Sequence, residues 1–143
     1  NLINKAIQNT EWPGRLEKIQ YKNKIFFIDG SHNEEGARKL NSFLIKNKIK
    51  PWIIFGMLNN KKIKKFLNKI KNQNYGLVAV KIPNEENAFN SEEIKKICDK
   101  INIKCIQKNT INEAISYLLN KKNKYILITG SLYLVGKIRK KLI

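Results

Sequence analysis

One stretch decides the fold, and it is Ile25-Phe26-Phe27-Ile28-Asp29-Gly30-Ser31-His32-Asn33-Glu34-Glu35-Gly36. Its four consecutive apolar residues are typical of a strand buried on both faces of a sheet. The strand runs into Asp29 and Gly30, and a helical pattern begins at Glu34. In α/β proteins, ligands bind where a strand ends and the next helix begins. The stretch therefore predicts a strand, a binding loop and a helix, and the loop holds the chain's only histidine, His32.

The same strand-then-helix pattern recurs along the rest of the chain. Apolar runs predict strands at residues 52–55, 77–82, 103–106 and 125–129. Apolar residues spaced three and four positions apart predict helices at residues 34–47, 61–71, 91–100 and 132–142. The same spacing predicts a further helix that begins from a cap at Asn112. Residues 18–20 and 24–28 flank a turn and predict a hairpin. This alternation favours a Rossmann-like α/β domain, with a mainly parallel sheet, helices on both faces and an N-terminal hairpin strand.

Composition limits the class of protein. The 143 residues suffice for one domain, and 42% of them are hydrophobic. No apolar run approaches the roughly 20 residues of a membrane span, and residues 1–5 lack the apolar stretch of a signal peptide, so we expect a cytoplasmic protein. The net charge is +18, but all but three of the 29 basic residues are Lys, and they are spread along the whole chain. We interpret this charge as a codon bias, because nucleic-acid sites favour Arg and aromatic residues on one face.

Two residues of the opening loop are candidate ligands of an anion or a nucleotide. Asp29 ends a buried strand, where a carboxylate can accept hydrogen bonds from the two hydroxyls of a ribose; alternatively it caps the following helix or forms an Asx-turn. His32 can donate to a phosphate oxygen beside a helix N-terminus. Alternatively it is an exposed residue of a polar turn.

Two further candidates lie outside that loop. Residues 130–137 resemble a phosphate loop but fail its spacing, since five residues separate the glycines. Ser131 therefore either binds a carboxylate or phosphate at a helix N-terminus or serves only as the N-cap. Arg15 follows a Pro-Gly turn and suits bidentate contact with a phosphate; a surface salt bridge with Glu11 or Glu17 is the alternative. We predict no metal site, because the single histidine and the two cysteines, Cys98 and Cys105, which we interpret as free thiols, show no spacing of metal ligands.

Four blocks taken together resemble one known family. They are WPGRLE at 12–17, DGSHNEEGA at 29–37, FGML at 55–58 and TGSLYLVG at 129–136. In this order and spacing they are similar to the C-terminal domain of folylpolyglutamate synthase and dihydrofolate synthase, in the Mur ligase superfamily. The resemblance implies an interdomain lead-in at residues 1–11 and the domain itself at 12–143. It also implies that the chain, which begins without Met, is part of a longer enzyme.

The resemblance implies an ATP-dependent ligase that adds L-glutamate to dihydropteroate, folates or both through an acyl phosphate. Its partners are ATP, L-glutamate and a pteroate or folate substrate. A central ATPase domain of the same chain would carry the phosphate loop and the Mg²⁺ ligands. The isolated domain is then expected to be inactive, and the enzyme to be a monomer. The alternatives are another Mur-type amino acid ligase domain or, in a different class, a basic nucleic-acid-binding module.

The resemblance also assigns roles to residues. Asp29 would bind the ribose hydroxyls, and Arg15 the ATP phosphates and the transferring charge. His32 would lie by the phosphates, the acyl phosphate and the glutamate, so His32 and Arg15 are the expected catalytic residues. Ser131 would bind the glutamate carboxylate. The sequence departs from the family at Ser31, where Ala is usual, and at residues 57–60, which lack the usual acidic pattern.

Overall fold

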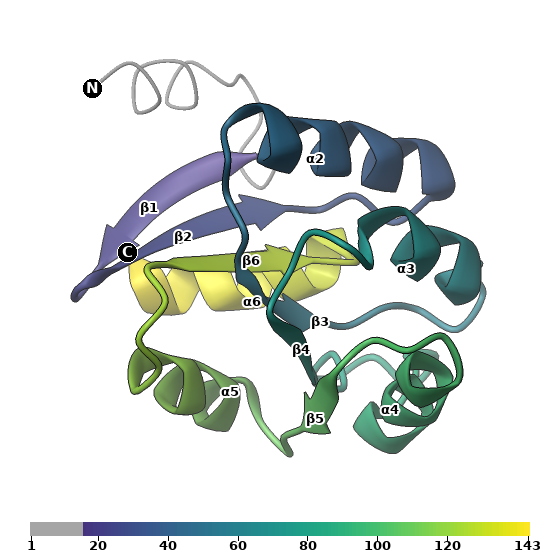
Figure 1. Ribbon diagram of the computed structural model, residues 1–143. Helices are drawn as coiled ribbons and strands as arrows, with labels where there is room; N and C mark the ends of the chain where they lie inside the picture. The colour runs from purple at the N-terminus through teal and green to yellow at the C-terminus, as the bar shows by residue number, and fades with distance from the viewer. Residues whose placement is uncertain (1–15) are drawn as a thin grey trace.

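Six strands form one sheet in the computed structural model, which describes residues 16–143. They are β1 (Glu17–Tyr21), β2 (Lys24–Asp29), β3 (Trp52–Phe55), β4 (Gly76–Ala79), β5 (Cys105–Gln107) and β6 (Tyr125–Thr129). Their order is β1-β2-β6-β3-β4-β5. Only β1 pairs in the antiparallel sense, as the outer arm of the hairpin with β2. The predicted parallel sheet and N-terminal hairpin are therefore confirmed (Figure 1).

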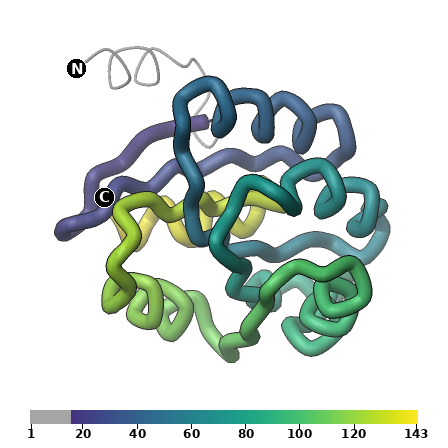
Figure 2. Tube along the Cα trace, in the orientation of Figure 1, coloured from purple at the N-terminus to yellow at the C-terminus, as the bar shows by residue number. Residues whose placement is uncertain are grey.

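Helices cover both faces of the sheet, as predicted. They are α2 (Glu34–Lys46), α3 (Ile63–Ile70), α4 (Ser91–Lys100), α5 (Ile111–Leu119) and α6 (Leu132–Leu142). The apolar sides of α2, α3 and α4 join one core cluster, and those of α5 and α6 join a second. Figure 1 shows α6 behind β6, and in Figure 2 the trace can be followed from each parallel strand into the helix that comes after it.

The continuous apolar run of β2 follows from its place between these two cores. Phe27 belongs to the cluster under α2, α3 and α4, while Phe26 and Ile28 belong to the cluster under α5 and α6. Alternate side chains of a strand point to opposite faces. Both faces of β2 are covered, so neither set of positions is polar.

Some predicted boundaries were wrong. β4 ends at Ala79 rather than residue 82: the amide of Val80 still donates to Phe55 O, but the chain then leaves the sheet as a loop in which Lys81 is exposed and Ile82 is buried. β5 starts at Cys105, after a residue with positive φ at Asn102. The cap of α5 is Thr110, whose hydroxyl accepts from Glu113 N at 3.1 Å, and not Asn112. In the described part of the chain, no helix is both long and apolar enough to cross a membrane.

Candidate active-site edge

The loops after β2 and β6 meet at the carboxyl edge of the sheet. β2 and β6 are parallel neighbours, with Asp29 in register with Thr129. Just beyond the strands, Gly130 N donates to Ser31 O at 3.1 Å. A Cβ on Gly30 would lie 2.2 Å from Leu132 Cδ2, so the two loops pack without room for a side chain. Two candidate segments about 100 residues apart along the chain thus form one site.

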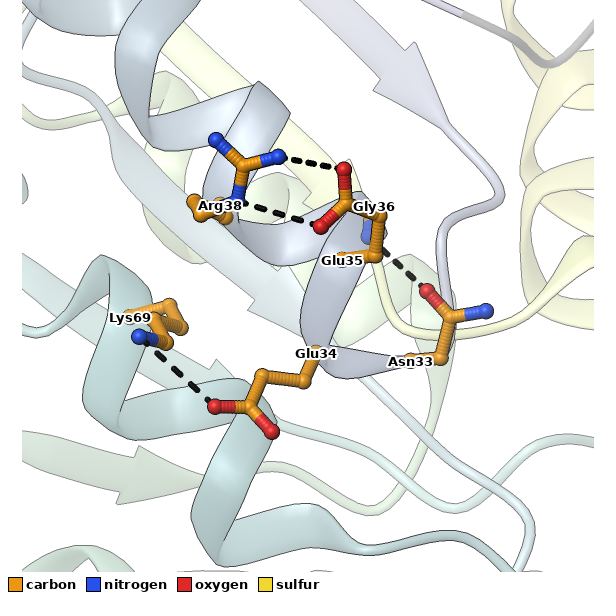
Figure 3. Close-up of polar contacts among 6 residues, drawn as sticks. All are labelled: Asn33, Glu34, Glu35, Gly36, Arg38 and Lys69. Atoms are coloured by element: carbon orange, nitrogen blue, oxygen red, sulfur yellow. Dashed lines mark hydrogen bonds and ion pairs between the residues drawn. The ribbon is translucent and has the colours of Figure 1, made fainter.

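Asp29 forms an Asx-turn, one of the two local alternatives considered for it. Its Oδ1 accepts from Ser31 N at 2.8 Å and from Ser31 Oγ at 2.7 Å. The helix cap is a different residue, Asn33, which accepts from Gly36 N at 2.8 Å (Figure 3). Ser31, the departure from the family pattern, therefore has a defined contact. Together the two bonds hold the Asp29 carboxylate in one orientation at the end of β2.

The start of α2 carries paired acidic residues. Arg38 Nε donates to Glu35 Oε1 at 3.1 Å, and this hydrogen bond lowers the pKa of Glu35. Glu34 lies 3.6 Å from Lys69 of α3, which joins the two helices (Figure 3). Glu35 is consequently ionised at neutral pH and already has a cation beside it.

Two cavities open at this edge. The first, which we name the Asp29 cavity, has a volume of about 460 Å³. It is lined by Leu16, Asp29, Gly30, Ser31, His32, Asn33, Glu35, Gly36, Lys39 and Leu40. The second, the Ser131 cavity, has a volume of about 400 Å³. It is lined by His32, Leu58, Lys61, Gly130, Ser131, Leu132 and Tyr133.

His32 lines both cavities and therefore lies between them. Its Nδ1 is 3.2 Å from Gly30 O. When Nδ1 carries the proton, it donates to that carbonyl, and Nε2 is left as an acceptor. A neutral imidazole held in this way can take a proton from a group bound in either cavity.

Ser131 is the N-cap of α6. Its Oγ accepts from Tyr133 N at 3.0 Å, and the residue is only 3% exposed. Ser131 therefore caps this helix. Capping does not exclude binding, because several amides of the first helical turn have no partner within the helix and point out of its N-terminus. The Ser131 cavity thus offers the helix N-terminus to a carboxylate.

Residues 14–141 match the family model described as dihydrofolate synthetase, C-terminal domain. The chain belongs to this family. It is 26% identical over 146 residues to the dihydrofolate synthase/folylpolyglutamate synthase of Bacillus subtilis (strain 168), an alignment that covers 98% of this chain and 33% of the relative. The chain thus spans about a third of the length of the curated relatives that it matches.

Solved structures support the same fold. The folylpolyglutamate synthase of Thermotoga maritima aligns with a TM-score of 0.82 at 24% identity, over 96% of this chain and 32% of that one. A bifunctional folylpolyglutamate synthase/dihydrofolate synthase solved with Mn, AMPPNP and L-glutamate aligns with a TM-score of 0.76 at 17% identity, over 94% of this chain and 32% of that one. The predicted family and its domain fold are confirmed.

In this member of the dihydrofolate synthetase family, sequence reasoning predicted only His32 and Ser131 of the Ser131 cavity and missed its lysine, Lys61. Lys61 is the only lysine or arginine among the described residues that line it. Nothing in a Lys-rich sequence marks one lysine as special. Lys61 could have been found from its position in the loop after β3, because β3 and β6 are parallel neighbours that end at the same edge of the sheet.

The geometry does not test two predictions, the phosphate contact of Arg15 and the location of the metal ligands in another domain. Arg15 lies outside the described residues, although its neighbour in sequence, Leu16, lines the Asp29 cavity. Within residues 16–143, no group of three or more His, Cys, Asp or Glu side chains is arranged to hold a metal ion. The described part of the chain therefore offers no cluster that fits a divalent cation.

Proposed function

We propose that this chain is the C-terminal domain, residues 12–143 after a lead-in at 1–11, of an ATP-dependent ligase. The ligase adds L-glutamate to dihydropteroate, folates or both through an acyl phosphate. One observation carries the proposal: His32 separates a cavity with an oriented carboxylate from a cavity with a helix N-terminus and a lysine. A ligase of this kind brings a nucleotide and an amino acid to the two sides of one reacting carbonyl.

The Asp29 cavity is the nucleotide side. Its oriented carboxylate suits the two ribose hydroxyls of ATP, and Arg15 would contact the phosphates and the charge that develops on transfer. The relative solved with AMPPNP and Mn supports ATP with a divalent cation; we propose Mg²⁺, held by the central domain of the same chain. The cation would neutralise phosphate charge there.

The Ser131 cavity is the glutamate side. One carboxylate of glutamate is held by the free amides at the N-terminus of α6, and the second by the Lys61 ammonium. The amino group then faces His32. In its neutral form, after its ammonium proton has been lost to solvent, its nitrogen attacks the acyl carbon. An amide bond forms, phosphate leaves with the bonding electrons of the C–O bond, and His32 accepts the proton that the attacking nitrogen then loses.

Lys61→Met is expected to raise the KM for L-glutamate by about 10- to 100-fold, because a charge-assisted contact contributes about 1.5–3 kcal/mol. The KM for ATP should stay within about twofold. The neighbouring Lys62, which is exposed and does not line the cavity, supplies the control Lys62→Met. Steady-state kinetics of both variants of the full-length ligase decide the point, and equal glutamate KM values would remove Lys61 from the site.

Ser131 serves as cap and as part of the glutamate site, and two variants separate these roles. Ser131→Ala removes the cap and should destabilise the domain by about 1 kcal/mol. Ser131→Asp keeps a capping oxygen but adds a negative charge beside the bound carboxylate. We expect Ser131→Asp to retain the thermal stability of the wild type and to raise the KM for glutamate more than tenfold. Normal glutamate binding by Ser131→Asp would contradict the assigned site.

The proposed function is tested by measuring ADP formation by the full-length ligase. We expect ADP only when a pteroate or folate acceptor and L-glutamate are both present, and no activity from the 143-residue chain alone. ADP formation that does not depend on glutamate would reject the proposal. We further propose that the ligase is a cytoplasmic monomer, which fractionation of cells and light scattering would check.

A further inference from the structure

A third cavity, of about 910 Å³, lies beside the same edge and has no role in the chemistry above. The loop after β4, the start of α5 and the second half of α6 form its walls. Four lysines line it, namely Lys81, Lys137, Lys140 and Lys141. We name it the lysine pocket.

The four lysines lack anionic partners in the described part of the chain. None of them forms an ion pair within 4.0 Å there. Two carboxylates, Glu85 and Glu86, also line the pocket, so the lining keeps an excess of positive charge. Unpaired ammonium groups around a cavity favour a ligand with several negative charges.

The start of α5 contributes little to this charge, because it is already capped. Thr110 Oγ1 accepts from Glu113 N at 3.1 Å, and Glu113 Oε1 accepts from Asn109 N at 3.1 Å. The Glu113 carboxylate thus occupies the positive end of the helix. Any attraction for an anion in the pocket comes from the lysine side chains.

The lysine pocket adjoins the Ser131 cavity. Tyr133 lines the Ser131 cavity, and Lys137, four residues or about 6 Å further along α6, lines the lysine pocket. The loops are also joined: Leu58 of the Ser131 cavity forms a β-bridge with Ala88, and Asn59 N donates to Asn87 O at 2.6 Å. The loop that contains Ala88 begins with residues of the lysine pocket.

We infer that the lysine pocket binds the carboxylates of glutamates already attached to the acceptor. This inference rests on the proposed function. Each glutamate linked through its side-chain carboxyl keeps a free α-carboxylate, so a polyglutamyl acceptor is a chain of negative charges that ends at the reacting group. With that group held beside His32, earlier carboxylates of the chain lie within reach of α6. Dihydropteroate has no glutamate and gains nothing from the pocket.

The test uses the full-length ligase and the triple variant Lys137→Gln/Lys140→Gln/Lys141→Gln, which keeps long side chains and helix propensity. Acceptors with no, one and three glutamates are compared. An exposed ion pair strengthens binding by up to about fivefold. We expect the KM for the triglutamyl acceptor to rise at least about tenfold. The KM for dihydropteroate, the KM for ATP and the kcat should all stay within about twofold of the wild-type values.

A matched control removes the same charge elsewhere, with Lys48→Gln/Lys100→Gln/Lys122→Gln. These lysines are exposed, form no ion pair among the described residues, and follow or end helices at the opposite edge of the sheet. An equal KM change in both triple variants, an equal change for all acceptors, or no change overturns the inference while leaving the proposed function intact. A wild-type ligase that forms no glutamyl product overturns both.

Discussion

Gly130→Ala is expected to destabilise the domain by about 3–5 kcal/mol, a large share of the total stability of a small protein. Gly130 has φ +113°, which only glycine adopts readily. An added Cβ would lie 2.2 Å from the carbonyl oxygen of Gly56 and 2.8 Å from Phe55 Cε1. The first neighbour is backbone at the end of β3 and cannot rotate away. The backbone strain at this φ and the overpacking by the added methyl group both destabilise the folded state, and the two costs add.

Thermal unfolding of the 143-residue chain, followed by circular dichroism, measures this effect. The expected loss is about 10–20 °C in Tm. Gly136 is the matched control: it lies in α6, is exposed, and a Cβ there would meet no atom within 4 Å. Gly136→Ala should raise the stability by up to about 1 kcal/mol, because alanine is the better helix former. A Gly130→Ala protein as stable as Gly136→Ala would refute the close approach of the two strand ends.

His32→Ala in the full-length protein, the proposed ligase, is expected to lower kcat at least tenfold, which is about 1.4 kcal/mol of transition-state stabilisation. The reason is the position of the ring between the Asp29 and Ser131 cavities. His32 is partly exposed and outside both cores, so the variant should keep its Tm. Rapid-quench measurement of product formation separates the chemical step from substrate binding.

His32→Asn distinguishes the two ring nitrogens. The asparagine amide can still donate to Gly30 O, as Nδ1 does at 3.2 Å, but it supplies nothing at the position of Nε2. If Nε2 takes the proton from the glutamate amino group, His32→Asn is as slow as His32→Ala. Wild-type kcat in His32→Asn would limit the histidine to a role in holding the loop.

The order of helices and strands was predictable because each element has an apolar pattern typical of its own kind of secondary structure. Ile25 to Ile28 are continuously apolar, and α2 has its apolar stripe at Ala37, Leu40 and Leu44. Strand order was not predictable, because β6 enters between β2 and β3 from the far end of the sequence. Nothing local to residues 125–129 specifies these neighbours.

The site was predictable where a strand end carries a distinctive residue. Asp29, His32 and Ser131 each follow an apolar run, and the structure brings all three to one edge. Lys61 was missed because Lys62, Lys64 and Lys65 follow it closely in the sequence. The lysine pocket was missed because its walls come from α6 and from the loops before α4 and α5. The Asx-turn at Asp29 depends on Ser31, which the sequence marked only as a departure.

In the proposed reaction, ATP phosphorylates an acceptor carboxylate, and glutamate then attacks the acyl phosphate. The decisive measurement uses an acceptor whose reacting carboxylate carries ¹⁸O, incubated with the full-length protein, ATP and L-glutamate. We expect one ¹⁸O atom of the acceptor to appear in the inorganic phosphate at each turnover. Phosphate that carries no label, while the glutamyl product forms, would contradict the acyl phosphate and the roles assigned to the two cavities.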